Sequence, residues 1–240
     1  MVQQLVLALV FLTRLPLGRF LPARMLPLSQ SLWAFPLAGL LVGLIAALPL
    51  WALGSSLLSA VLSVTLAVWF TGALHEDALA DFADAAGGKD RHDRLRIMRD
   101  SAIGSYGVMA LILCTAMRIA AIAQLTPLAV IAAAIAGRTA VVIAMAILPP
   151  ARSDGLGKSA GRADAANIAI ASLIGGLTML FLGGPGIAAA IAGLIALGLV
   201  IRKAKQWLGG QTGDVLGTAS IITETAVLAV LSIFAGMAIA

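Results

Sequence analysis

Long apolar stretches with almost no charge dominate the sequence and restrict what it can fold into. A membrane-spanning helix needs about 20 apolar residues, because it rises about 1.5 Å per residue across roughly 30 Å of hydrocarbon. Stretches of about this length cover residues 32–53, 57–74, 104–123, 127–148, 166–183, 186–201 and 221–240. Hydrophobic residues make up 61% of the chain and charged residues only 11%, so a soluble core could not bury this much apolar surface. We therefore predict an all-α, polytopic membrane bundle of about seven transmembrane helices.

A shorter apolar segment opens the chain, in MVQQLVLALVFLTRLPL. It lacks the basic region and the small-residue cleavage pattern of a secretion signal, and it is too short to span a bilayer. We expect a short N-terminal helix that is retained and lies in the membrane interface. No internal repeat is clear, so residues 1–240 are expected to form one membrane-embedded domain.

The charged residues alternate from one connecting segment to the next. Three short breaks at 54–56, 124–127 and 183–186 contain no charge. The other loops, at about 75–103, 149–165 and 202–220, carry most of the basic residues, and all eleven acidic residues lie in them or in the adjoining helix ends. Lysine and arginine mark the cytoplasmic side of a membrane protein. We therefore expect a cytoplasmic N-terminus and chemistry at the cytoplasmic face.

The excess of basic residues has a membrane explanation. The formal net charge is +5, and no basic run is interleaved with aromatic residues as in nucleic-acid-binding segments. We therefore expect contact with the lipid bilayer and its anionic headgroups, and no nucleic-acid partner. The single cysteine, Cys114, excludes a disulfide framework and a cysteine metal site.

The segment GALHEDALADFADAAGGKD, residues 72–90, concentrates carboxylates in this apolar chain. Asp77, Asp81 and Asp84 are spaced i, i+4, i+7, so a helix would place them on one face, where they repel one another. Hard divalent cations prefer oxygen ligands, so the segment predicts a Mg²⁺ site, with His75 as a candidate general base. A solvated turn at a helix end is the alternative interpretation.

The segment RHDRLRIMRDSAIGSYGV, residues 91–108, places arginines before a glycine-containing turn. Acids beside arginines are typical of phosphoryl transfer, in which metal ions and cations stabilise phosphate charge. Asp100 is therefore a candidate metal ligand and Arg99 a candidate catalytic cation. The candidate substrate- or phosphate-binding residues of this turn are Ser101, Gly104 and Tyr106. The arginines could equally be anchors on the cytoplasmic side.

Two further polar segments contain candidate residues. LGGQTGDVLGTASIITE, residues 208–224, suggests a phosphate loop of Gln211, Thr212 and Gly213, with Asp214 as a metal ligand. In the loop at 149–167 the basic residues Arg152, Lys158 and Arg162 could meet an anionic substrate, although a plain anchoring loop explains them equally well.

Two arginines interrupt the apolar segments. Arg138 lies near the middle of one, where a charge is costly and by default functional or ion-paired. We expect Arg138 to face the bundle interior, to meet a carboxylate or a substrate phosphate, and to act in catalysis. Arg118 is closer to the uncharged side, and we expect it to extend towards the interface.

The motifs resemble those of the cobalamin synthase family, the adenosylcobinamide-GDP ribazoletransferases. HEDALADFADA resembles HxDGLADxxDG, IMRDSAIGSYG resembles IM[KR]DSxIGxYG, and GGQTGDVLG resembles GGxTGDxLG. FLTRLPL is similar to the family's usual opening, and the four motifs follow in order along the chain. Ala78 and Ala85 replace two glycines of the first motif, whereas each ionisable position is kept.

The resemblance implies a Mg²⁺-dependent reaction in the bacterial inner membrane. A ribose hydroxyl of α-ribazole, or of its 5′-phosphate, attacks the phosphate on the cobinamide side of adenosylcobinamide-GDP, and GMP leaves. Asp77, Asp81 and Asp84, with Asp100 or Asp214, would hold Mg²⁺. Arg99 and Arg138 would stabilise phosphate charge. A homo-oligomer is left open.

Two other functions are weaker alternatives. A CDP-alcohol phosphotransferase needs D-x-x-D-G-x-x-A-R, but here Asp84 is followed by Ala85 and the arginine is absent. A cation or solute transporter usually binds its substrate near the bilayer midplane, whereas these acids gather at the cytoplasmic edge.

Overall fold

The computed structural model describes residues 1–21, 27–152 and 164–237. Within these ranges every regular element is a helix, as the sequence predicted, apart from one isolated bridge between Pro150 and Gln211. The 3-10 helices are η1 (Gly18–Phe20), η2 (Leu28–Ala34) and η3 (Ala85–Gly87). The α-helices are α1 (Val2–Leu12), α2 (Phe35–Leu53), α3 (Leu57–Thr71), α4 (Leu74–Asp84), α5 (Arg91–Ile97), α6 (Ser105–Ile122), α7 (Pro127–Ile147), α9 (Ala165–Phe181), α10 (Gly183–Leu208) and α11 (Gly213–Met237).

Each of the seven apolar segments forms a helix, but not each is long enough to cross a membrane. Five helical stretches pass on length and composition, namely η2 with α2, α6, α7, α10 and α11. α9 has only 17 residues, and α3 passes only together with α4, from which it is bent by 89°. The count is therefore five, or six if the bent pair is one span, among the described residues. The expected short N-terminal helix is present as α1.

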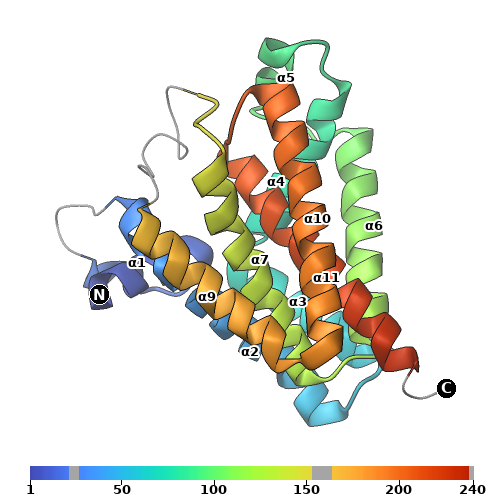
Figure 1. The fold of residues 1–240 in the computed structure, drawn as a ribbon. Coiled ribbons are helices and arrows are strands. Elements are labelled where there is room, and N and C mark those ends of the chain that lie inside the picture. Colours follow the sequence, from blue (N-terminus) through green and yellow to red (C-terminus); the bar gives the residue numbers. More distant parts are fainter. Residues whose placement is uncertain (22–26, 153–163, 238–240) are drawn as a thin grey trace.

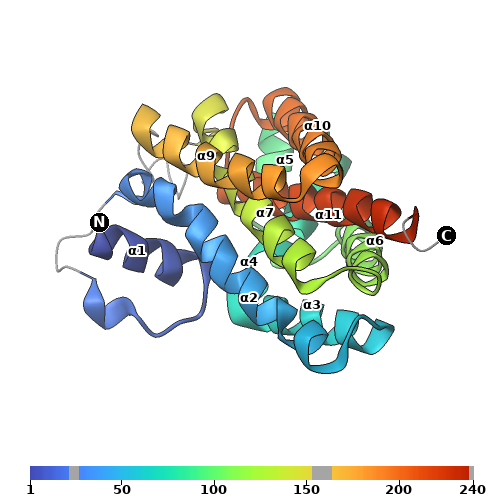
Figure 2. The same cartoon turned by 60° about the horizontal axis from the view of Figure 1, so that its bottom comes forward.

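α7 and α11 form the centre of the bundle (Figures 1 and 2). α7 packs against α2, α9 and α11, while α11 also packs against α4, α6 and α10. Most residues of α7 are buried, on every side of the helix. α7 is rich in alanine, and such small side chains let neighbouring helices approach it from every side.

Glycines allow α2 and α7 to pack closely. Gly39 and Gly43 lie one turn apart on the face of α2 that meets α7. A Cβ atom on Gly39 would lie 2.7 Å from the carbonyl oxygen of Ala134, and one on Gly43 would lie 2.7 Å from the Cα of Ile131. Small residues four positions apart are typical of membrane helix pairs, in which packing replaces the hydrophobic effect as the driving force.

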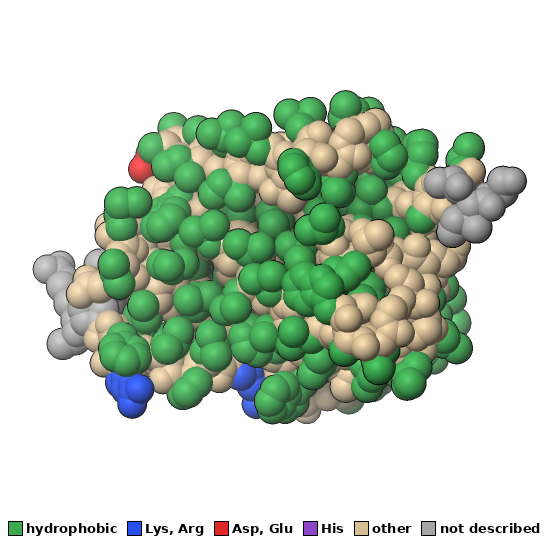
Figure 3. Space-filling model, turned by 90° about the horizontal axis from the view of Figure 1, so that it is seen from below, with side chains coloured by type: hydrophobic (Ala, Val, Ile, Leu, Met, Phe, Trp, Pro, Cys, Tyr) green, Lys and Arg blue, Asp and Glu red, His purple; other side chains and the backbone are tan. Residues whose placement is uncertain are grey.

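The outer surface matches a lipid environment. Figure 3 shows a face covered mainly by hydrophobic side chains, with charged ones only at its margin. Large apolar side chains such as Trp69 and Phe181 are 74% and 80% exposed. A soluble monomer rarely exposes so large a continuous apolar area. The surface therefore supports a multi-pass membrane protein.

Gly39→Ala is expected to destabilise the bundle, because the new Cβ would overlap the backbone of α7. Overpacking of this kind costs about 1–3 kcal/mol. Thermal unfolding in detergent would measure the loss as a lower Tm. Gly198→Ala on α10 is the matched control, since nothing lies within 4 Å of a Cβ there. Equal Tm values for the two variants would contradict the close contact between α2 and α7.

Candidate active site

The acidic helix α4 begins at a sharp turn after α3. Gly72 and Ala73 both have positive φ angles, 69° and 60°, and Ala73 is the one residue other than glycine with this conformation in the described parts of the chain. The N–H of Ala73 donates to the carbonyl of Val68 at 2.9 Å, which closes the end of α3. The turn directs α4 away from the axis of α3, so the carboxylates do not continue the apolar helix.

α4 has one polar and one buried face, as its spacing predicted. His75, Ala78, Leu79 and Phe82 are buried, whereas Asp77 is exposed and Asp81 half-buried. The buried face packs closely on α11, because a Cβ on Gly217 would overlap the Cβ of Ala78. Ala78 occupies a glycine position of the motif, so the contact with Gly217 explains why only a small residue fits there. The hydroxyl of Thr218 also donates to the Ala78 carbonyl at 3.0 Å.

A cavity of about 260 Å³ joins the first and third sequence motifs. His75 and Asp77 of α4 and Gly213 and Asp214 of α11 line one part of it. Apolar side chains from α1, η2, α2 and α7 line the rest. A mostly apolar cavity with a few convergent polar groups is typical of a small-molecule site. This cavity is the candidate active site.

The carboxylates around this cavity influence one another. The negative charges of Asp214, Asp77 and Asp84 repel the carboxylate of Asp81. The positive charge of Arg152 attracts it. Among the described residues, however, no three His, Cys, Asp or Glu side chains converge closely enough to hold a metal ion. Mg²⁺ usually takes only one or two carboxylates and completes its shell with water and phosphate oxygens. One or two of the Asp77, Asp81 and Asp214 carboxylates could therefore hold Mg²⁺ together with a phosphorylated substrate.

Asp84 has another task in the structure. Its carboxylate accepts hydrogen bonds from the N–H of Gly104 at 2.7 Å and from that of Gly107 at 2.8 Å, at the start of α6. A Cβ on either glycine would lie 2.5 Å from an Asp84 oxygen, so the glycines of the second motif make room for this carboxylate. Asp100 is exposed and accepts from the N–H of Ala102 at 3.1 Å. Both acids thus support the loop before α6.

The other candidates of the second motif lie outside the cavity lining described above. Ser101 and Tyr106 are exposed, and the Tyr106 ring lies beside Gly87. Arg99 lies in a separate basic pocket of about 280 Å³, whose described lining is His92, Leu95, Arg96, Arg99 and Arg152. The positive charge of Arg152, one of these lining residues, acts on Asp81 and Asp214.

The arginines of α5 mostly hold the neighbouring loops together. Arg91 donates to the carbonyl of Leu208, the last residue of α10, at 2.7 Å. Arg94 lies 5.5 Å from the centre of the Trp207 ring. Arg96 donates to Asp93 at 2.7 Å, and this hydrogen bond lowers the pKa of the exposed Asp93 carboxyl. These contacts give the arginines a structural role. The sequence alone could not distinguish this role from anchoring at the membrane surface.

The third motif builds the loop that positions Asp214. Gln211 exchanges two backbone hydrogen bonds of 2.8 Å with Pro149 and Ala151, after α7. The hydroxyl of Thr212 accepts from the N–H of Val215 at 3.3 Å and so caps α11. Both side chains are buried, and Gly213, Asp214, Leu216 and Gly217 of this motif line the cavity. Lys158 and Arg162 lie outside the described residues.

The two arginines within apolar segments both pair with buried acids. Arg138 faces the interior and meets Glu224, which confirms the expected carboxylate partner. The prediction that Arg118 extends to the interface is wrong, because it is buried and pairs with Glu76 and Glu224 at 2.9 Å each. Sequence reasoning assigned no role to Glu76 or Glu224. Glu224 lies within an apolar helix, as do the two arginines. This pattern is the signal in the sequence that could have identified their ion pairs.

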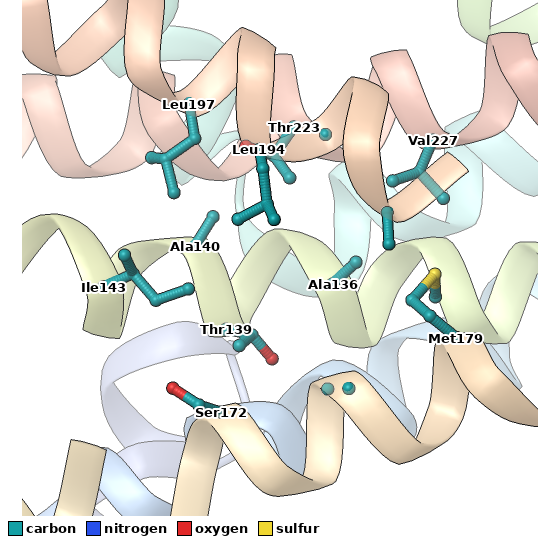
Figure 4. Close-up of a pocket in the computed structure, with 14 residues that line it drawn as sticks. Ala136, Thr139, Ala140, Ile143, Ser172, Met179, Leu194, Leu197, Thr223 and Val227 are labelled. Carbon is teal, nitrogen blue, oxygen red and sulfur yellow. The ribbon is translucent and has the colours of Figure 1, made fainter. Parts of the chain in front are cut away.

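A second cavity, of about 250 Å³, lies between α7, α9, α10 and α11 (Figure 4). Its described lining is apolar apart from the hydroxyls of Thr139, Ser172 and Thr223. The Thr139 hydroxyl already donates to the carbonyl of Ile135 at 2.9 Å. With no acid or base in that lining, this cavity lacks the groups that phosphoryl transfer requires.

Comparison with known proteins places these features in one family. A family profile described as cobalamin-5-phosphate synthase matches residues 4–232. An adenosylcobinamide-GDP ribazoletransferase of Bradyrhizobium diazoefficiens is 44% identical, over 95% of this chain and 92% of the relative. Proteins of the same name from Mesorhizobium japonicum and Xanthobacter autotrophicus are 42% and 44% identical, over 95% and 98% of this chain and 92% and 97% of the relatives. No solved structure matches the chain.

Gly107→Ala is expected to lower stability by about 1–3 kcal/mol, because its Cβ would displace Asp84 and break the cap of α6. Chemical unfolding in detergent would measure the loss. Ser105→Ala is the matched control, since Ser105 is exposed at the start of the same helix. A Gly107→Ala protein as stable as this control would show that the Asp84 cap contributes little.

Proposed function

The chain belongs to the cobalamin-5-phosphate synthase family, and from this premise we propose that it acts as an adenosylcobinamide-GDP ribazoletransferase. The observation that carries the proposal is the cavity in which His75 and Asp77 of the first motif meet Asp214 of the third. These residues are far apart in the sequence, yet they face one space. Acids, a base and nearby cations are the groups that phosphoryl transfer needs.

The proposed reaction transfers a phosphoryl group between two oxygens. A ribose hydroxyl of α-ribazole, or of α-ribazole 5′-phosphate, attacks the phosphorus on the cobinamide side of the diphosphate. A new P–O ester bond forms, and the bond between this phosphorus and the oxygen bridging to GMP breaks. The hydroxyl proton passes to a base, and GMP leaves with the bridging oxygen. The product is adenosylcobalamin or its 5′-phosphate.

The residues of the cavity have separate proposed tasks. His75 is buried at the cavity wall, where it would accept the proton of the attacking hydroxyl. Arg99, in the basic pocket, would bind phosphate oxygens on the GMP side. The apolar walls from α1, α2 and α7 would keep out water, which would otherwise compete with the ribose hydroxyl for the phosphate.

One or two of Asp77, Asp81 and Asp214 are the proposed protein ligands of Mg²⁺, with water and phosphate oxygens completing its shell. The mutual repulsion of these carboxylates would be relieved by a divalent cation, and Arg152 offsets it only in part. When bound, Mg²⁺ would neutralise charge on the diphosphate. Asp84 is a weaker candidate than the sequence indicated, because both of its oxygens accept hydrogen bonds from α6.

Turnover of adenosylcobinamide-GDP and α-ribazole tests this proposal directly. Wild-type protein in detergent or liposomes is expected to release GMP only when Mg²⁺ is present. Asp81→Asn keeps the size of the side chain but removes its charge, so the rate should fall about 100-fold or more. Asp93→Asn is the control, because Asp93 lies on α5, outside the cavity. Folded wild-type protein without turnover, or full activity in Asp81→Asn, would contradict the proposal.

We also propose that the active face is cytoplasmic and the membrane the bacterial inner membrane. Lys89 lies in a charged loop and Thr126 in an uncharged break, and both are exposed. In intact cells an impermeant maleimide should label Thr126→Cys and leave Lys89→Cys unlabelled until the cells are opened. The native Cys114 is buried, so unmodified protein supplies the background signal. The reverse labelling pattern would show that the protein has the opposite orientation in the membrane.

A further inference from the structure

Two glutamates and two arginines from four helices meet inside the bundle. Arg118 of α6 donates from Nη1 to Glu76 of α4 and from Nη2 to Glu224 of α11, both at 2.9 Å. Arg138 of α7 donates to the second oxygen of Glu224. The side chains of Arg118, Arg138 and Glu224 are at most 9% exposed, and that of Glu76 is 15% exposed. We call these four residues the buried ion network.

The network balances its own charge. Two guanidinium groups face two carboxylates, so the group is neutral although each member is charged. Removing one member leaves a partner charge unpaired in a low-dielectric interior, which is strongly unfavourable. The four residues therefore act as one unit, and a change in one shifts the others.

The absence of a side chain at Gly137 lets α7 and α11 come close enough for these ion pairs to form. A Cβ on Gly137 would lie 2.9 Å from the carbonyl oxygen of Ser220 and 3.2 Å from Oε2 of Glu224. Gly137 directly precedes Arg138, so its missing side chain lets Glu224 reach the guanidinium. The backbone is thus shaped to bring these charges together.

The network contacts α4 at a place where that helix needs support. α4 has 11 residues and follows the sharp turn at Gly72 and Ala73, so α3 does not determine its direction. Besides its packing on Gly217 of α11, three hydrogen-bonded contacts hold it to its neighbours. Glu76 binds Arg118 near its start, the Ala78 carbonyl accepts from Thr218 in the middle, and Asp84 caps α6 at its end.

The first of these contacts lies next to the candidate catalytic groups. Glu76 stands between His75 and Asp77, both of which line the active-site cavity. Glu76 thus links the network directly to the wall of the cavity. Neither arginine of the network belongs to the described lining of that cavity. The network is therefore placed to orient α4 without touching the substrate.

We infer that the buried ion network positions α4, so that Asp77 faces Asp214 across the cavity. Arg118 and Arg138 are then positioning residues of the transferase. The kinetic part of this inference rests on the proposed function, whereas the structural part does not. A small displacement of α4 would separate the groups of the first motif from Asp214, because these come from different helices.

Steady-state kinetics of Arg118→Gln, Arg118→Lys and wild type test the positioning role. Arg118→Gln should lower kcat about 100-fold, because misplaced catalytic groups cost about this much, while KM for each substrate changes less than about threefold. Arg118→Lys keeps the charge and should recover part of the rate. Glu76→Gln combined with Arg118→Gln should be no slower than Arg118→Gln alone, because both act through one contact. Arg202→Gln, an exposed arginine on α10, is the matched control.

Hydrogen exchange provides a readout that needs no activity. In Arg118→Gln the amides of 74–84 should exchange at least about tenfold faster than in wild type, while those of α2 keep their rates. If kcat per folded molecule is unchanged and only Tm falls, the network merely stabilises the bundle and the inference is wrong. Unchanged exchange in α4 would also overturn it. An inactive wild type would instead reject the proposed function, and the exchange result would still decide the positioning of α4.

Discussion

The arrangement of the helices depends on the pairing of charged side chains that are buried away from water. A chain this apolar can keep Arg118, Arg138 and Glu224 inside its bundle only if each finds a partner of opposite charge. The partners come from different helices, so meeting this requirement also determines how α6, α7 and α11 are arranged. Glu76 extends the same pairing to α4. The need to neutralise buried charge thus connects the membrane core to the acidic helix.

Small residues make these contacts geometrically possible. Where a Cβ would overlap a neighbour, as at Gly217 against Ala78 or Gly107 against Asp84, the backbones or carboxylates can come close only because the side chain is absent. Membrane helices gain little from burying apolar surface against each other, so close packing and polar contacts have to hold them. The same glycines that tighten the bundle therefore shape the walls of the site.

Much of the fold and part of the site could be predicted from residue patterns. The seven apolar segments form helices, and the i, i+4, i+7 acids do lie on one helix. Five of these helices are long and apolar enough to cross a membrane, or six if the bent pair is one span, because α9 is short and the apolar run at 57–74 turns sharply at Gly72. Arg118 was misplaced, because distance along a helix says nothing about the acid facing it from another helix. Residue types alone could not show that Gln211 and Thr212 are buried and lie outside the described lining of the cavity.

The sequence by itself determined that this protein is a helical membrane protein of the cobalamin-5-phosphate synthase family, with its acids gathered in particular segments. Hydropathy and helical spacing are properties of neighbouring residues, so they can be read along the chain. Only the tertiary structure decided that Asp77 and Asp214 line one cavity while Asp84 caps α6. Which carboxylate does which task depends on the angles at which helices cross, and these follow from packing between residues distant in the sequence.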